Sequence, residues 1–89
     1  SSIRKITSDA IDKYIKETYS ALHLQILIAA ESRRYTTSFA ASEVPMELVT
    51  WLLIKNFILF WGDKNGKRYR ITMPSDYPED KAVTLTVTW

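Results

Sequence analysis

The most informative pattern of hydrophobic and polar positions lies on either side of Asn65 and Gly66. Strand-forming residues flank this pair over residues 57–72, and an Asn-Gly pair tolerates the positive φ angles of a two-residue hairpin turn. The pattern therefore predicts a β-hairpin. With Asn65 and Gly66 as its whole loop, Trp61 lies opposite Arg70.

The predicted register gives the hairpin two different faces, because successive side chains of a strand point to opposite sides. We expect the core face to hold Ile58, Phe60, Tyr69, Ile71 and Met73. The other face then holds Leu59, Trp61, Asp63, Arg68, Arg70 and Thr72. Because this second face is aromatic and mostly basic, it is a candidate binding surface.

The first third of the chain has the periodicity of an amphipathic helix. Apolar residues at helical spacing are Ile11, Ile15, Leu22, Ile26 and Ala29. Thr7 or Ser8 can cap this helix, so we expect it over residues 8–30. One alternative stays open, because residues 22–28 also alternate as a strand does and residues 35–39 could pair with them as a hairpin.

The middle of the chain predicts a second main helix. Residues 36–42 indicate a short helix or a turn, and Pro45 suits the first turn of a helix over residues 45–56. On a helical wheel its core side holds Pro45, Leu48, Val49, Leu52, Leu53 and Asn56. Its outward side holds Glu47, Thr50, Trp51 and Ile54. Exposed apolar and aromatic groups of this kind are typical anchors of protein interfaces. One alternative stays open, in which the long first helix or the last strand covers Trp51 and Ile54 as part of the core.

The end of the chain predicts one further strand. Residues 82–89 alternate Val, Leu and Trp with Thr, which indicates a half-buried strand that pairs with the hairpin. The elements together predict one α+β domain with a long N-terminal helix, a second main helix, a hairpin and a C-terminal strand. The chain lacks an initiator Met and stops inside this strand, as a domain excised from a larger protein would.

This order of elements resembles that of winged helix-turn-helix domains over about residues 10–73. The segments that carry the resemblance are residues 21–28, 35–45 and 48–56, followed by the hairpin. They correspond to a first helix, a short second helix, a recognition helix and the wing. The resemblance implies a winged-helix-like fold and DNA binding in transcription regulation. The space for the second and third helices is shorter by about one turn than in typical members.

Size and composition favour a single packed domain. The chain has 89 residues, of which 46% are hydrophobic and 12% aromatic, well above the content of disordered segments. The longest apolar run, residues 26–30, is too short to cross a membrane, so we expect no membrane partner. The absence of cysteine suits a reducing compartment, and we expect an intracellular protein, either cytoplasmic or nuclear.

The sequence contains no catalytic or cofactor motif. His23 is the only histidine and has aliphatic neighbours, which makes it a poor candidate for a general base. Asp76, Glu79 and Asp80 lack the spacing and the glycine of a calcium loop. Residues 69–78 resemble the strand and Tyr-Pro turn of ubiquitin-conjugating and RWD-type folds, but the chain has no cysteine for thioester chemistry. We expect no enzyme activity, no metal and no cofactor.

Two functional hypotheses follow. The first is a non-catalytic module that docks a protein partner or its own copy through Trp51, Ile54, Thr50 and Glu47, together with a free edge of the strand over residues 82–89. The second is a nucleic-acid-binding regulator that grips phosphates with Lys64, Lys67, Arg68, Arg70, Arg33 and Arg34. The net charge of +2 is too small to decide between them.

Overall fold

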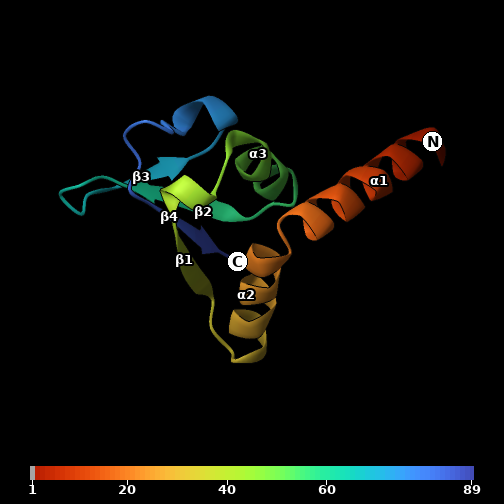
Figure 1. The fold of residues 1–89 in the computed structure, drawn as a ribbon, viewed down its shortest axis with the longest axis horizontal. Coiled ribbons are helices and arrows are strands. Elements are labelled where there is room, and N and C mark those ends of the chain that lie inside the picture. The colour runs from red at the N-terminus through yellow and green to blue at the C-terminus, as the bar shows by residue number, and fades with distance from the viewer. Residues whose placement is uncertain (1) are drawn as a thin grey trace.

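The computed structural model describes the backbone of residues 2–89 and the side chains of residues 9–89. Over these residues the chain forms three α-helices, four β-strands and two short 3-10 helices (Figure 1). The helices are α1 (Ser2–Thr18), α2 (Ser20–Glu31), η1 (Ala41–Glu43), α3 (Met46–Ile54) and η2 (Pro74–Asp76). The strands are β1 (Thr36–Ala40), β2 (Ile58–Gly62), β3 (Arg68–Ile71) and β4 (Thr84–Thr88). The predicted α+β class is confirmed.

The four strands form one antiparallel sheet in the order β1-β4-β2-β3. The last strand pairs with the first strand of the hairpin, as the sequence predicts, and Leu85 and Val87 are fully buried. However, β4 also pairs with β1 on its other side, so it is a central strand. The expectation that the strand over residues 82–89 offers a free edge for docking is therefore wrong.

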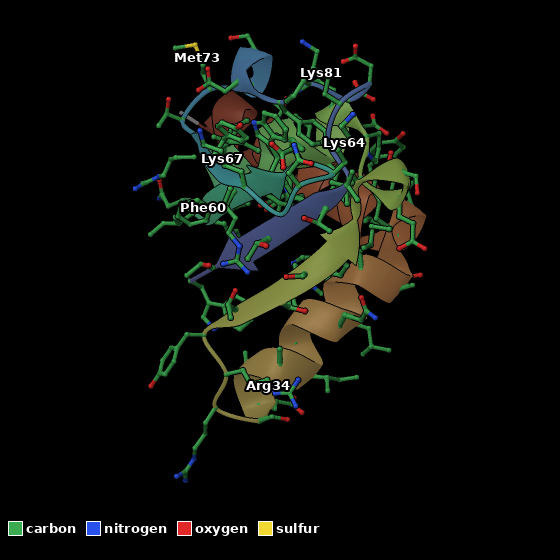
Figure 2. The ribbon with its side chains drawn as sticks, turned by 90° about the vertical axis from the view of Figure 1, so that its left-hand side faces the viewer. Arg34, Phe60, Lys64, Lys67, Met73 and Lys81 are labelled. Carbon is green, nitrogen blue, oxygen red and sulfur yellow. The ribbon has the colours of Figure 1, made fainter. Side chains whose placement is uncertain are left out.

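The helices cover one face of the sheet only. Figure 2 looks onto the other face, with β1 and β4 crossing in front of α2. The buried core lies between the sheet and the helices and consists of Ile15, Phe39, Ala41, Val44, Leu48, Val49, Trp51, Leu52, Leu59, Ile71, Tyr77, Leu85 and Val87. Tyr77 fixes the connection before α3, because its hydroxyl donates to the carbonyl oxygens of Ala41 and Val44.

The predicted single helix over residues 8–30 is in fact two helices that meet at Tyr19, where φ is −115° and ψ is 42°. Thr7 and Ser8 are not caps, since α1 begins at Ser2. The break falls at Thr18, Tyr19 and Ser20, which are weaker helix formers than the residues around them. The Tyr19 hydroxyl donates to Glu47 of α3. The C-terminal part of α1 contacts α3 through Asp12, while its N-terminal part projects away from the rest of the domain (Figure 1).

The alternative hairpin over residues 22–39 is resolved in favour of helix for its first half. Residues 20–31 form α2, whereas residues 36–40 form strand β1 rather than the expected short helix or turn. The partner of β1 is β4, which lies more than forty residues further along the chain. Local periodicity carries no information about such a partner, and this explains the wrong expectation for residues 36–40.

Both α2 and α3 end in the same backbone motif, with a residue in the left-handed conformation. Arg33 has a φ of 62°, and its amide and that of Arg34 donate to the carbonyl oxygens of Ala30 and Ala29. Asn56, with a φ of 67°, ends α3 in the same way. These are Schellman motifs, in which glycine is preferred at the left-handed position and asparagine is tolerated.

The hairpin exists, but its register differs by one residue from the prediction. Trp61 pairs with Tyr69 and Phe60 with Arg70, so the loop spans residues 63–67. The side chain of Asp63 organises this longer loop, because its Oδ1 accepts the amides of Asn65 and Lys67 at 2.9 and 3.0 Å.

The shift exchanges the two faces of β2, as a one-residue slip must. Leu59 is fully buried against the helices, while Ile58 and Phe60 point to the uncovered face, so their predicted core placement is wrong. The placement of Tyr69 and Ile71 on the core side is consistent with the structure, since Ile71 is 1% exposed and Tyr69 half-buried. Met73 is exposed rather than in the core.

Candidate interaction surfaces

The outward face predicted for α3 is covered by α1. Trp51 is only 8% exposed, and its indole Nε1 donates to Asp12 Oδ1 at 2.9 Å. The Lys55 ammonium binds the other oxygen of the same carboxylate at 2.6 Å. These two contacts, with Lys55 the stronger, lower the pKa of Asp12. Of the two alternatives for Trp51, the exposed one is wrong and cover by the first helix is confirmed, because Trp51 joins α1 to α3.

The other three residues proposed for that face have separate roles. Glu47 accepts the hydroxyl of Tyr19, and this hydrogen bond raises the pKa of Tyr19 to about 12. The Thr50 hydroxyl donates to the carbonyl of Met46, one turn earlier, at 2.9 Å. Ile54 is 68% exposed and is the only large apolar side chain of the four that stands in solvent. The four residues do not form a continuous apolar surface.

A larger apolar surface lies on α2, on the side that faces away from the sheet. Leu22, Ile26 and Ala29 pack toward the core, whereas Leu24, Leu27 and Ile28 are 55%, 44% and 53% exposed. We call these last three residues the aliphatic stripe. Their spacing of three and four residues places them on one side of the helix, directly opposite the core side.

The sequence analysis missed the aliphatic stripe, although a signal was present. Residues 18–30 contain no Asp, Glu, Lys or Arg, and α2 is apolar on both of its sides. A helix that packs on a sheet with one side and exposes the other side to water normally carries charged residues on the exposed side. A charge-free helix indicates burial on both sides, and this domain covers only one.

The predicted phosphate-binding cations fall into two separate groups. Arg33 and Arg34 lie in the turn before β1, beside the end of the sheet where Thr36 pairs with Thr88. The hairpin loop with Lys64 and Lys67 follows Gly62, at the other end of the sheet. Figure 2 shows Arg34 far from Lys64 and Lys67. The six cations therefore do not form one cluster.

The uncovered side of the sheet, which we call the open face, brings Arg68 and Arg70 together with Phe60. Its positions are Thr36, Ser38, Ala40, Ile58, Phe60, Gly62, Arg68, Arg70, Thr84, Thr86 and Thr88. One cross-strand row runs over all four strands as Ser38, Thr86, Phe60 and Arg70. The guanidinium of Arg70 lies 5.9 Å from the centre of the Phe60 ring, within the range of a cation–π contact.

Short polar side chains fill most of the open face. Ser38 and Thr86 share a hydrogen bond of 3.1 Å, and Thr88 donates to Thr36 at 3.2 Å. Gly62 provides room for Thr84, because a Cβ at position 62 would lie 2.4 Å from the Thr84 hydroxyl. The side chains of the open face are consequently short on β1 and β4, and the larger side chains at its β2 and β3 positions stand above them.

The opposite side of the hairpin carries an aromatic pair. The rings of Trp61 and Tyr69 stack with their centres 4.4 Å apart and line a shallow groove with Lys64 and Lys81. Asp63 belongs to this side, since its Oδ2 accepts the Tyr69 hydroxyl at 3.1 Å. Partial burial opposes a fall in its pKa, but this bond and the two loop amides together lower it. Trp61 is thus separated from Arg70, which packs on Phe60 instead.

The acidic turn after β3 is explained by local structure. Asp76 accepts the amide and the hydroxyl of Thr72 and the amide of Met73, and these bonds lower its pKa. Across the described side chains, no group of three or more His, Cys, Asp and Glu is arranged to hold a metal ion. None of the described helices is both long enough and apolar enough to cross a membrane.

Comparisons of the chain with protein-family models, with curated proteins and with solved structures found no match. The aliphatic stripe and the open face are thus the two surfaces of this domain on which a functional proposal can rest.

Proposed function

We propose that this domain is a non-catalytic interaction module that associates with a second copy of itself through the aliphatic stripe of α2. The observation that carries the proposal is the side of α2 opposite the sheet, where three aliphatic side chains are about half exposed and no residue before Glu31 is charged. Contiguous exposed apolar surface of this kind marks interaction sites. The aliphatic stripe replaces the outward face of α3 as the proposed docking surface, because Trp51 on α3 is buried in contact with α1.

Charge distribution favours a second copy as the occupant. Two α2 helices can pack against each other without like charges in contact, since residues 18–30 carry none. Glu31, at the C-terminal end of the stripe, is the only charged residue of α2. In an antiparallel pair it lies beside the N-terminus of the partner's α2, where a negative charge is stabilised by the helix dipole. A twofold pair places both copies of Glu31 in this favourable position.

The magnitude predicts a modest affinity. Full burial of a Leu or Ile side chain is worth about 1.5–3 kcal/mol, so burying the exposed halves of six such side chains contributes about 5–9 kcal/mol. Association costs about 4–15 kcal/mol in lost freedom of motion. The stripe alone therefore supports a weak dimer, and the exposed Ile11 and Tyr14 of the projecting α1 are the next available contact area.

Sedimentation equilibrium over a wide range of protein concentration tests the proposal. We expect reversible dimerisation that is lost when Leu24, Leu27 and Ile28 are all replaced by Gln, a residue with good helix propensity. Ile54→Gln is the matched control, because it removes an exposed aliphatic side chain from another helix. A wild-type protein that stays monomeric near millimolar concentration, or a triple variant that dimerises as well as the wild type, would contradict the proposal.

The DNA-reading role implied by the winged-helix resemblance has less support. Base edges in the major groove are read mainly by Arg, Lys, Asn and Gln. On α3 the side that carries Trp51 is covered by α1, and the exposed Ile54 cannot make such bonds. We therefore assign no base readout to α3.

A further inference from the structure

We propose that the open face binds single-stranded nucleic acid, with Phe60 as a stacking platform and the arginines of β3 as phosphate ligands. This site is independent of the aliphatic stripe. In the described strands, Arg68 and Arg70 are the only charged residues at open-face positions. The partner that such a surface complements is a polyanion, and the aromatic ring selects a polyanion with accessible bases.

Phe60 is placed as a platform. It lies on the central strand β2, half-buried, between Thr86 on one neighbouring strand and Arg70 on the other. Its neighbours on β4 have short side chains, the guanidinium of Arg70 is the group that lies over the ring, and Figure 2 shows Phe60 at the surface of this side. Arg70 extends the platform, because its guanidinium lies near the ring and arginine also stacks on bases.

The cations define the path of the backbone. Arg68 and Arg70 occupy successive open-face positions of β3, and Lys67 directly precedes this strand in the hairpin loop. The ammonium of Lys67 lies over the Tyr69 ring on the opposite side of the hairpin, at 5.3 Å from the ring centre. A strand that runs along β3 on the open face therefore meets two cations, Arg68 and Arg70, while its bases point inward over Phe60. The exposed hydroxyls of Ser38 and Thr84 lie across the sheet and offer donors and acceptors without demanding one sequence.

The form of the face favours single strands over duplexes. A duplex keeps its bases stacked and offers a flat sheet mainly its phosphates, so the ring of Phe60 would contribute nothing. With two phosphate contacts, single-strand binding should weaken with salt with a logarithmic slope of about −1.4. An acidic protein segment would use the same arginines, but it would gain nothing from base stacking.

Fluorescence anisotropy with labelled oligothymidylate, a duplex of equal length and a polyglutamate peptide separates these cases. The variants are Phe60→Leu and the pair Arg68→Gln with Arg70→Gln. Lys13→Gln with Lys16→Gln on α1 is the charge-matched control. Circular dichroism melting confirms that each variant is folded.

We expect oligothymidylate to bind more tightly than the duplex or the peptide. Phe60→Leu should weaken it at least about fivefold, the lower bound for loss of a stacked base. The arginine pair should weaken binding further and flatten the salt slope, whereas the control should retain most of the affinity. Three results would overturn the proposal. They are no binding at low salt, equal affinity for polyglutamate, and unchanged affinity in folded Phe60→Leu.

Discussion

Replacing Trp51 by Ala should destabilise the domain far more than replacing Ile54 by Ala, although both residues lie on α3 and both were expected to face outward. Trp51 is 8% exposed and Ile54 68% exposed. Truncating a buried Trp to Ala costs about 3–5 kcal/mol. An 89-residue domain has a total stability of about 4–13 kcal/mol, so Trp51→Ala removes a large share of it. Ile54→Ala should change the stability by less than about 0.5 kcal/mol.

Urea unfolding and thermal unfolding, each followed by circular dichroism, measure the stability of both variants. At about 4–8 °C per kcal/mol, Trp51→Ala should lower the midpoint of thermal unfolding by more than about 12 °C. Trp51→Phe is the informative control, because it keeps most of the buried ring and removes only the indole donor to Asp12. It should be much milder than Trp51→Ala. Equal losses for Trp51→Ala and Ile54→Ala would refute the packing of α1 on α3.

Three further predictions concern the backbone and the charges. Arg33→Gly should stabilise the domain by about 0.5–1 kcal/mol in urea unfolding, because the φ of 62° suits glycine, and a loss of stability would contradict the left-handed conformation. Gly62→Ala should cost about 1–3 kcal/mol through its contact with the Thr84 hydroxyl, and much less when Thr84→Ala is also present; equal losses in both backgrounds would exclude that contact. The folded-state pKa values of Asp63 and Asp76 lie below their ordinary 3.8. The two carboxylates therefore contribute fully to the free energy of unfolding well above pH 4, and this contribution is lost as the pH falls below 3.8. Acid unfolding of the Asp63→Asn and Asp76→Asn double variant should therefore be less steep than that of the wild type, and an unchanged profile would contradict this assignment.

Elements with strong local signals were predictable from the sequence. The helix over residues 45–56, the hairpin around Gly66 and the final strand all correspond to observed elements. The hairpin register was not predictable in the same way, because Asp63 folds back on the loop amides and lengthens the loop from two residues to the span 63–67. The loop held by Asp63 and a two-residue Asn-Gly turn differ by one residue in register. The loop that forms therefore decides which side chains of β2 face the core.

The candidate surfaces depended on these tertiary details. Phe60 was assigned to the core only because of the register, and Trp51 to the surface only because of its position on the helical wheel of residues 45–56. The register depends on the contacts of Asp63 within the loop, whereas the burial of Trp51 depends on α1, whose Asp12 lies 39 residues away in the sequence. The aliphatic stripe was accessible to sequence reasoning, since the lack of charge over residues 18–30 needs no tertiary information.

The two proposed surfaces lie on opposite sides of the domain, because the open face, the sheet, α2 and the aliphatic stripe follow one another as layers. A dimer formed through α2 therefore leaves both open faces free and directs them away from each other. A short oligothymidylate of about 10 nucleotides can occupy only one face, so it should bind the wild type and the triple stripe variant equally. A strand several times longer can reach both faces of a dimer, and its apparent affinity should be higher for the wild type by the effective-concentration effect. If the stripe variant instead weakens the short oligonucleotide as well, the two surfaces are not independent and the layered arrangement cannot explain binding.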